Sequence, residues 1–294
     1  MGEVAAAIFT THVPRLTIRD PAARKAYMGR NVSTFYDAMD QLARERLRDL
    51  SFDTFVLFDS HWFTTLDYVI NAHARLSGIY TSEELPEMLH EMPYDYAGDP
   101  ELARAIEKAA RGRGMHAIAS AHRNLPIHYP TLTVMAYFNP EANRRVLSIG
   151  VCQTASVDND LNFGGAVADA VRATDRCVVL VASGGLSHKF WDYDHAREHA
   201  SAAPEDISSP ANRAGDERVM QWFRDGRHDE VIRHAQEYRA QCSPEGRFSH
   251  YLMMAGAMGA GRWNWRGEQF GRYEAALGTG QAIFFFAPPQ AGVA

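Results

Sequence analysis

Short apolar runs and longer stretches with helical spacing alternate along most of the chain. Runs rich in β-forming residues predict strands. These runs lie at residues 4–10, 55–58, 145–151, 177–182 and 281–286, and shorter strands are expected at 67–74 and 114–119. The run at 281–286 has bulky apolar residues at successive positions, which is typical of a strand buried on both faces.

Apolar side chains spaced by three or four residues predict helices between and after these strands. Asp99 and Pro100 mark one helix start, as an N-cap followed by a proline in the first turn. The expected helices cover residues 33–50, 99–112, 159–174, 216–225, 228–241 and 248–259. A polar loop is expected after the first strand. We also expect a packed, site-covering loop at 78–98, an irregular loop at 124–131 and a mobile or solvent-facing connection at 189–215.

This alternation of strands and helices predicts the α/β class. We expect one catalytic domain over residues 1–294, with a mostly parallel mixed central sheet that is flanked by helices and followed by a helical C-terminal portion. The first strand, the helix at 33–50 and the strand at 55–58 form a strand–helix–strand unit. Such a unit predicts a parallel pair of strands joined by a right-handed crossover.

The composition excludes several classes of protein. At 294 residues and 46% hydrophobic residues, the chain can bury a large core. Its net charge of −6 is spread over interspersed residues, so neither nucleic acid nor an anionic membrane is expected as a partner. Three widely spaced cysteines without a Cys-x-x-Cys pair argue against a disulfide scaffold or a structural zinc site. Without a secretion signal or an apolar run of about 20 residues, a soluble cytoplasmic protein is expected.

Three of the predicted strands end in a histidine. His12 follows the first strand, His61 the second, and His188 follows the strand at 177–182 after a glycine-rich turn. Ligands of open α/β sheets bind at the carboxyl ends of the strands. Imidazole is a common ligand of transition metals, so His12 and His61 are candidate metal ligands, and His188 is a candidate acid/base. A hydrogen-bonded structural histidine is the competing interpretation for each.

Two histidines need one carboxylate to complete the facial triad of non-heme Fe(II) oxygenases, and Glu245 is the candidate. It lies in a tight turn ahead of an apolar helix, which can direct an acidic side chain inward. The competing interpretation is a first-turn glutamate that complements the helix dipole. His128 and Tyr129, in the proline-rich loop, are weaker candidates. The other histidines are expected at the surface or in an outer layer of the site: His73, His90, His116, His122, His195, His199, His228, His234 and His250.

Four segments, taken together, resemble the landmarks of a known family. They are Thr11-His12-Val13-Pro14, Phe58-Asp59-Ser60-His61-Trp62, Ser183-Gly184-Gly185-Leu186-Ser187-His188 and Pro244-Glu245-Gly246. In their order and approximate spacing, the sequence is similar to the type III extradiol ring-cleaving dioxygenases, the superfamily of the protocatechuate 4,5-dioxygenase β-subunit. Residues 79–102 also resemble the branch that opens 3,4-dihydroxyphenylacetate.

This resemblance implies that His12, His61 and Glu245 bind Fe(II) and that His188 is the acid/base. The implied reaction is extradiol (meta) cleavage of a catecholic, 3,4-dihydroxyphenylacetate-like aromatic by O2 in aromatic compound degradation. His128 matches a histidine near the metal in protocatechuate-type members. The dihydroxyphenylacetate branch instead has an acidic residue there, followed by a tyrosine that matches Tyr129. Both residues are therefore expected to contact substrate, and a homo-oligomer is expected because family members are generally oligomeric.

Three alternatives stay open. The same pocket could accept a hydroxypyridine or hydroxypyridone diol or 2-aminophenol. Memo-like relatives share the fold and are regarded as binding proteins without an enzymatic activity. A zinc hydrolase would use the same ligand types, although the helical His-Glu-x-x-His signature is absent. Fe(II) and Mn(II) both suit the expected ligand set.

Overall fold

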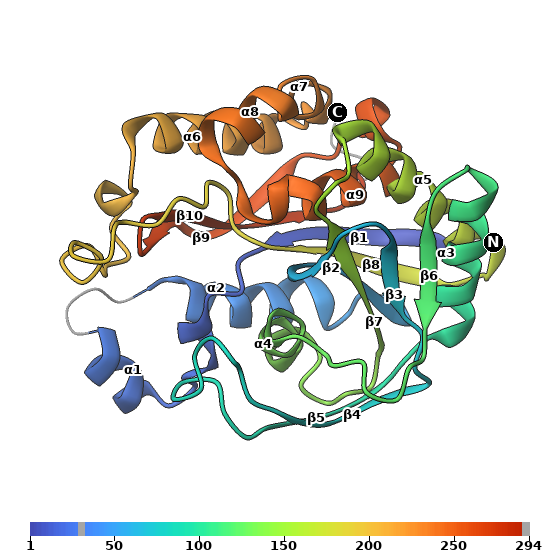
Figure 1. The fold of residues 1–294 in the computed structure, drawn as a ribbon, viewed down its shortest axis with the longest axis horizontal. Helices are drawn as coiled ribbons and strands as arrows, with labels where there is room; N and C mark the ends of the chain where they lie inside the picture. Colours follow the sequence, from blue (N-terminus) through green and yellow to red (C-terminus); the bar gives the residue numbers. More distant parts are fainter. Residues whose placement is uncertain (29–32, 290–294) are drawn as a thin grey trace.

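The computed structural model describes residues 1–28 and 33–289, and its centre is an eight-stranded mixed sheet (Figure 1). The strands lie in the order β6-β3-β7-β2-β8-β1-β10-β9. Their bounds are β1 Glu3–Thr10, β2 Thr54–Thr64, β3 Tyr68–Asn71, β6 Ala117–Ser120, β7 Arg145–Cys152, β8 Cys177–Ser183, β9 Gly267–Ala276 and β10 Thr279–Phe286. β4 (Arg75–Tyr80) and β5 (Met92–Ala97) form a separate antiparallel hairpin.

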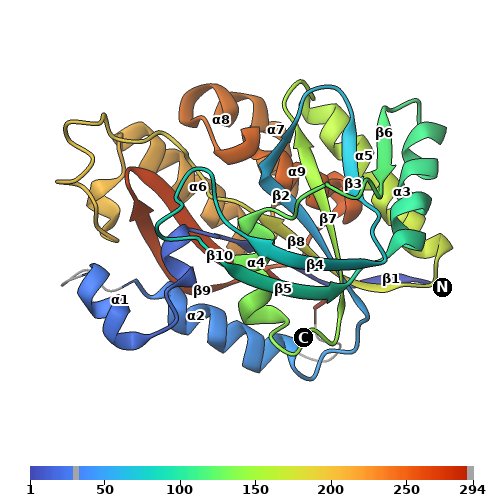
Figure 2. The same ribbon diagram turned by 60° about the horizontal axis from the view of Figure 1, so that its bottom comes forward.

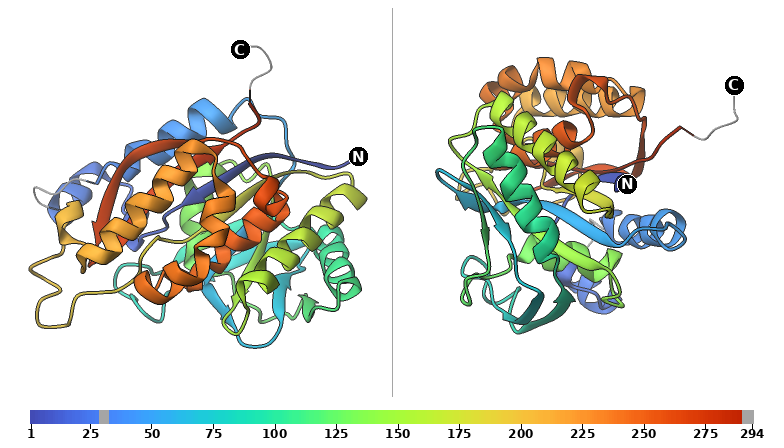
Figure 3. Two further views of the ribbon diagram at one scale, coloured as in Figure 1. Left: turned by 90° about the horizontal axis from the view of Figure 1, so that it is seen from above. Right: turned by 90° about the vertical axis from the view of Figure 1, so that its right-hand side faces the viewer.

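Helices cover both faces of the sheet (Figure 3). One face carries α3 (Pro100–Gly112), α5 (Val157–Ala173), α6 (Pro210–Asp225), α7 (His228–Arg233), α8 (Ala235–Cys242) and α9 (Ser249–Ala257). The other carries α2 (Phe35–Leu42), continued by a π-helical segment Ala43–Leu47, together with α4 (Tyr129–Phe138) and the hairpin. Shorter elements are α1 Pro21–Met28 and the 3-10 turns Pro14–Thr17, Pro204–Asp206, Glu245–Phe248 and Ala260–Arg262. The predicted α/β fold, with its mixed sheet and helical C-terminal portion, is confirmed.

The alternation of side chains along the central strands builds two hydrophobic cores. In β2, Val56 and Phe58 pack in the core beneath α5 and α9, whereas Phe55 and Leu57 pack in the core beneath α2 and α4. All four side chains are fully buried. A strand with helices on both sides needs apolar residues at successive positions, which is why these strands were visible as apolar runs.

Four central strands, β7, β2, β8 and β1, run parallel to one another. The expected direct pairing of the first two strands is wrong, because β8 lies between β1 and β2 and pairs with both. The three strands are equally apolar, so the pattern contains no information on which of them lies in the middle. Their shared direction nevertheless places three strand ends at one edge of the sheet.

The pattern of apolar residues did not predict several elements that have one side exposed to solvent. The expected loop at 78–98 overlaps most of the β4–β5 hairpin (Figure 2), in whose two strands all positions but one are half-buried or exposed. β9 is an edge strand with several polar residues, and α1, in the region expected as a polar loop, is mostly exposed. The expected helix at 228–241 is two helices that meet at His234.

The two loops expected around residues 124–131 and 189–215 are each shortened by a helix start. α4 begins at Tyr129, with a proline in its first turn, and α6 begins at Pro210, where the Ser209 side chain accepts from two backbone N–H groups.

No helix in the described part of the chain combines the length and the apolar character needed to cross a bilayer.

Candidate metal centre and active site

The carboxyl ends of β1, β2 and β8 bring the three predicted histidines to one edge. His12 lies just beyond the end of β1, and His188 follows β8 after its glycine-rich turn. His61 was expected at the end of its strand, but β2 continues past it. The register between β2 and β7 shifts between Asp59 and Phe63, so the intervening residues bulge out of the ladder. Such bulges re-aim side chains beside functional sites.

Glu245 comes from the turn between α8 and α9. Its backbone N–H donates to the carbonyl of Leu186 at 3.0 Å, which ties the turn to the segment that carries His188. The next three residues have left-handed φ angles of 52°, 56° and 63°, and two of them, Arg247 and Phe248, are not glycine. A left-handed backbone conformation costs each of these two non-glycine residues about 1–2 kcal/mol relative to the right-handed one. This strained turn directs the carboxylate inward, so that only 5% of the Glu245 side chain is exposed.

His12, His61 and Glu245 converge on one small region. The Nε2 atoms of His12 and His61 lie 3.0 Å and 3.5 Å from Oε1 of Glu245. One ligand atom from each residue lies within 4.8 Å of the other two. Metal–ligand bonds of about 2.0–2.2 Å place neighbouring ligand atoms about 3 Å apart. The donor types and spacing therefore fit a transition metal bound by two imidazoles and one carboxylate.

Polar groups around the cluster orient the imidazole of His12 and the carboxylate of Glu245. The hydroxyl of Ser183 lies 3.0 Å from Nδ1 of His12, which leaves Nε2 to face Glu245. Ser60 donates its hydroxyl to Oε1 of Glu245 at 2.6 Å, and the backbone N–H of Gly185 donates to Oε2 at 2.5 Å. Partners of this kind orient the ligands of metal sites.

Electrostatics hold the carboxylate in its charged form. Burial alone would raise the pKa of Glu245, but the positive charges of His12 and His188 and the hydrogen bond with His12 hold that pKa well below its usual range. Burial opposes the protonation of His12, yet Glu245 raises the pKa of His12 above its usual value. Burial and the nearby charge of His12 lower the pKa of His61. The carboxylate of Glu245 therefore stays charged although it is buried, and a bound cation can take the place of the positive charge that now faces it.

One side of the cluster is open. The side chains of His61 and His188 are 25% and 24% exposed, whereas those of His12 and Glu245 are almost fully buried. Nε2 of His188 lies 3.7 Å from Oε2 of Glu245, and the ring of Phe190 packs edge-on against His188 at 4.8 Å. His188 therefore lies beside the cluster on the side from which a small molecule can approach.

Tyr129 and His128 lie at the start of α4. The hydroxyl of Tyr129 is 2.9 Å from Nε2 of His61, and its buried ring lies edge-on to both His61 and His12. His128 stacks on the indole of Trp62 at 5.7 Å. The structure thus gathers all six predicted site residues in one neighbourhood.

Other groups at or near the site were not predicted. Ser60, Ser183 and Gly185 act on the cluster through hydroxyl or backbone groups, for which the sequence has no specific signal beyond proximity to the motifs. His228 and His250 were expected at the surface or in an outer layer, but both are fully buried. His250 precedes the aromatic and apolar residues of α9, which were an available signal, whereas His228 stands between Arg227 and Asp229 and its immediate neighbours gave none.

Comparisons with known proteins agree with this geometry. A family described as the catalytic LigB subunit of aromatic ring-opening dioxygenase matches residues 6–286. The chain is 31% identical over 262 residues to the 3,4-dihydroxyphenylacetate 2,3-dioxygenase of Escherichia coli, which covers 88% of this chain and 91% of the relative. It is 23% identical over 247 residues to the 2-aminophenol 1,6-dioxygenase alpha subunit of a Pseudomonas species, covering 82% and 86% of the two chains.

A solved structure supports the fold. The crystal structure of an uncharacterised protein of Escherichia coli K12 superimposes with a TM-score of 0.61 over 96% of this chain and 99% of that chain, at 15% sequence identity. Together with the match over nearly the whole sequence, the fold and the converging histidines and glutamate identify the family. The chain belongs to the LigB family of catalytic subunits of aromatic ring-opening dioxygenases and is a ring-cleaving dioxygenase of the extradiol type.

Proposed function

We propose that this protein is a non-heme Fe(II) dioxygenase that opens the ring of a catechol with a short acidic side chain, such as 3,4-dihydroxyphenylacetate. We assign the reaction to residues 1–294 as one catalytic domain. The single observation that carries the proposal is the convergence of His12, His61 and Glu245, because two imidazoles and one carboxylate on one face are the ligand set of non-heme Fe(II) oxygenases.

We assign the metal ligands to Nε2 of His12, Nε2 of His61 and a carboxylate oxygen of Glu245. These three residues would hold a ferrous ion on one face, and the bound ion would supply open positions for a diol and O2 and the means of electron transfer between them. The chain contributes the positions of the ligands. Ser183 fixes the ring of His12, and Ser60 and Gly185 fix the carboxylate.

His188 is proposed as the acid/base residue. Its imidazole lies 3.7 Å from Glu245 and is partly open to solvent, so it can accept a proton from a substrate hydroxyl and return a proton during ring opening. Tyr129 and His128 are proposed to bind the substrate. The hydroxyl of Tyr129 already reaches the cluster, and the ring of His128 stands beside Trp62.

The relatives support two substrate classes. The E. coli relative, named for 3,4-dihydroxyphenylacetate, is the more similar of the two and favours a catechol with an acidic substituent. The Pseudomonas relative, named for 2-aminophenol, favours an aminophenol as the second candidate. Both substrates present two neighbouring donor atoms on an aromatic ring, so a metal held by the same three residues can bind either substrate.

The direct test is anaerobic reconstitution with Fe(II), followed by oxygen-electrode assays with 3,4-dihydroxyphenylacetate, protocatechuate, 2-aminophenol and a hydroxypyridine diol. We expect Fe(II)-dependent oxygen uptake and a yellow ring-opened product with the first substrate. Parallel loading with Mn(II) and Zn(II) distinguishes the metal. Oxygen uptake without added metal or after chelation would refute the assignment.

Glu245→Gln is the matched variant for the metal site. The amide keeps the shape of the side chain but removes the negative charge, so we expect loss of stoichiometric Fe(II) binding as well as loss of turnover. A protein that binds no metal and consumes no oxygen with any of these substrates would instead favour a Memo-like binding role. The homo-oligomeric state and the cytoplasmic location stay predictions, which light scattering and cell fractionation would test.

A further inference from the structure

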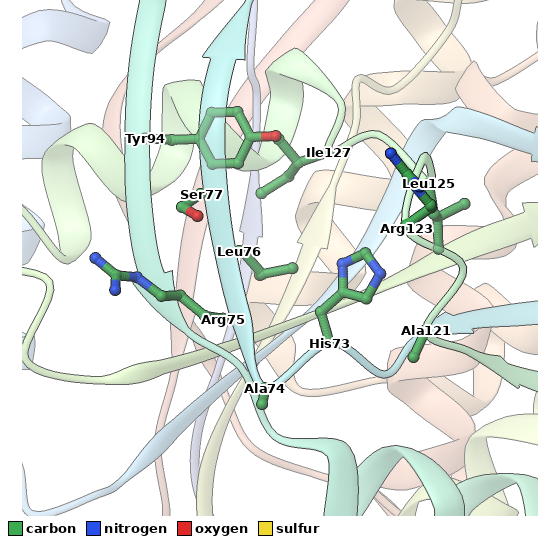
Figure 4. Close-up of a pocket in the computed structure, with 10 residues that line it drawn as sticks. All are labelled: His73, Ala74, Arg75, Leu76, Ser77, Tyr94, Ala121, Arg123, Leu125 and Ile127. Atoms are coloured by element: carbon green, nitrogen blue, oxygen red, sulfur yellow. The ribbon is translucent and has the colours of Figure 1, made fainter.

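A cavity of about 370 Å³ lies outside the proposed active site, between the β4–β5 hairpin and the loop that precedes α4 (Figure 4). It is lined by His73, Ala74, Arg75, Leu76, Ser77, Tyr94, Ala121, Arg123, Leu125 and Ile127. None of these residues belongs to the cluster of His12, His61 and Glu245. The volume falls in the range of small-molecule sites, which is about 300–1,000 Å³.

The cavity has an apolar wall. Leu76 and Ile127 are almost fully buried, and Leu125 and the ring of Tyr94 extend the apolar surface. Figure 4 shows the Tyr94 ring above Leu76, with its hydroxyl directed toward Ile127. A flat hydrocarbon or aromatic group can cover this wall, which a small inorganic anion would leave in contact with water.

The polar part of the lining consists of donors and cations without an acidic side chain. Arg75 is already neutralised, since its guanidinium forms two hydrogen bonds with Asp95, and in Figure 4 it extends away from His73 and Arg123. Arg123, by contrast, makes no hydrogen bond or ion pair within residues 1–28 and 33–289. Nε2 of His73 lies 3.0 Å from the carbonyl of His122, next to Arg123 in the chain.

We propose that this cavity is a second ligand site, which binds a small aromatic monocarboxylate. The free guanidinium of Arg123 holds the carboxylate, because an unpaired arginine with planar donors is suited to that group. The aromatic body lies against Leu76, Ile127 and Tyr94. This site is separate from the metal centre, so ligand binding here stands whether or not the substrate assigned above is correct, and only the effector role below rests on the proposed function.

The position of the cavity in the chain suggests an effector role. Ile127 lines the cavity, and the next two residues are His128 and Tyr129, of which Tyr129 reaches Nε2 of His61. A ligand that packs against Ile127 therefore acts on the segment proposed to bind substrate. Coupling between two sites is reciprocal, so each ligand must change the affinity of the other by the same factor.

The test uses phenylacetate, which lacks the hydroxyl pair needed to chelate a metal, and measures its binding by calorimetry. The metal-loaded protein is saturated with 4-nitrocatechol, so that the active site is blocked. We expect a dissociation constant of about 0.1–1 mM, as a ligand of ten non-hydrogen atoms allows. Phenylacetamide, which lacks the charge, and inorganic phosphate, which lacks the apolar body, should each bind at least about tenfold more weakly.

Arg123→Gln should weaken phenylacetate binding roughly tenfold or more, since it removes a charge-assisted hydrogen bond. Arg262→Gln is the matched control, because Arg262 is also an exposed arginine that makes no ion pair in the described part of the chain, and it lies far from this cavity in sequence and fold. Equal binding by wild type and Arg123→Gln would overturn the site. Phosphate binding as tight as phenylacetate would overturn the ligand class, and unchanged 4-nitrocatechol affinity at saturating phenylacetate would overturn the effector role. None of these measurements requires turnover.

Discussion

At the scale of single residues, His188 is the imidazole that we propose as the acid/base of the site. It is not one of the three proposed metal ligands, it is partly open, and it lies 3.7 Å from Glu245. His188→Phe should leave metal and substrate binding largely intact and reduce kcat by about 10²–10⁴-fold, which is the usual contribution of a positioned acid/base. Oxygen-electrode kinetics and a metal determination on the same sample check this prediction.

The control for this variant is His195→Phe. His195 is exposed and lies in the connection that follows His188, so its replacement makes the same chemical change at a neighbouring surface position. We expect wild-type turnover for His195→Phe. Unchanged turnover for His188→Phe would remove that residue from the mechanism.

Tyr129 supports a second prediction at this scale. Its hydroxyl lies 2.9 Å from Nε2 of His61, and this nitrogen cannot both accept the hydroxyl proton and bind a metal. Tyr129→Phe removes the competing hydrogen bond, so we expect metal affinity to rise by a few-fold and catechol affinity to fall by up to about tenfold, in line with one hydrogen bond of about 0.5–1.5 kcal/mol.

Chelator competition under anaerobic conditions measures the first effect, and titration with 4-nitrocatechol measures the second. Tyr137→Phe is the control, because Tyr137 is a buried tyrosine of the same helix whose hydroxyl donates to the carbonyl of Leu16 rather than to the cluster. Weaker metal binding by Tyr129→Phe would contradict the competition.

Some residues of the candidate site could be predicted from the sequence and others could not. His12, His61 and His188 were predictable because each lies at or near the carboxyl end of an apolar run. Glu245 was ambiguous on pattern, and the resemblance to a family decided between a helix-end residue and a ligand. Ser60 and Ser183 were not predictable as partners, because a serine hydroxyl acquires this role only when the fold brings it to within about 3 Å of a ligand.

At the scale of elements, Asp216 connects the segment that carries His188 to the helical layer. It lies in α6 and is fully buried, and it accepts hydrogen bonds from the backbone N–H and hydroxyl of Ser187 and from the hydroxyls of Tyr238 and Tyr273. Burial raises the pKa of Asp216 to about 6, although all four donors favour the charged form. One carboxylate thus joins α6, α8, β9 and the turn after β8.

Asp216→Asn should destabilise the fold and misplace His188. The amide cannot accept four hydrogen bonds, so buried hydroxyls lose partners at about 1–3 kcal/mol each. We expect the free energy of unfolding, measured in urea at pH 8 where Asp216 is charged, to fall by about 2–4 kcal/mol. Turnover at a temperature where the variant stays folded should also fall.

Tyr273→Phe provides the comparison for this network. It removes a single donor and leaves the contacts between Asp216 and Ser187 in place, so it should cost about 1 kcal/mol and leave turnover close to that of the wild type. If Asp216→Asn and Tyr273→Phe had equal turnover, the carboxylate would not position His188.

Elements were predictable in proportion to their burial on both sides. β8, β10 and α5 were recovered closely from apolar periodicity, and the N-cap of α3 from the Asp99-Pro100 pair, whose aspartate accepts from the N–H of Leu102. β9 and the hairpin were missed because a strand with one solvent face carries polar residues, prolines and tyrosines. The bulge in β2 was also missed, since it depends on the register with β7 rather than on β2 alone.

At the scale of the whole molecule, the order of the strands could not be read from the chain. Helices lie in most of the connections between strands of the main sheet, although β2–β3 and β9–β10 follow one another without a helix, and this order along the chain does not reveal that β8 lies between β1 and β2. The fold class needed only the alternation of elements. The complete topology required long-range pairing, such as that of β1 with β10 across most of the chain.

The stability of the whole molecule should depend on a histidine far from the site. His228 is fully buried, its Nδ1 lies 2.9 Å from the hydroxyl of Tyr251, and its Nε2 lies 2.9 Å from the carbonyl of Trp265. Its ring stacks on Trp263 at 3.4 Å. The neutral imidazole, donating from Nε2 and accepting at Nδ1, satisfies both contacts. Burial lowers the pKa of His228 to about 4, although the hydrogen bond with the carbonyl of Trp265 and the nearby charge of Asp229 both oppose this shift.

A lowered pKa in the folded state means that the unfolded chain binds the proton more readily. The wild type should therefore have its full stability above pH 6.5 and lose about 3 kcal/mol as the pH falls from 6.5 toward 4, from this residue alone. In His228→Gln, which cannot titrate, that loss should be absent. The measurement is the difference in unfolding free energy between wild type and variant at several pH values, which cancels the contributions of other groups. His195→Gln makes the same substitution at an exposed histidine and is measured beside it as the control. A difference for His228→Gln that does not change with pH would mean that His228 is not held neutral by the fold.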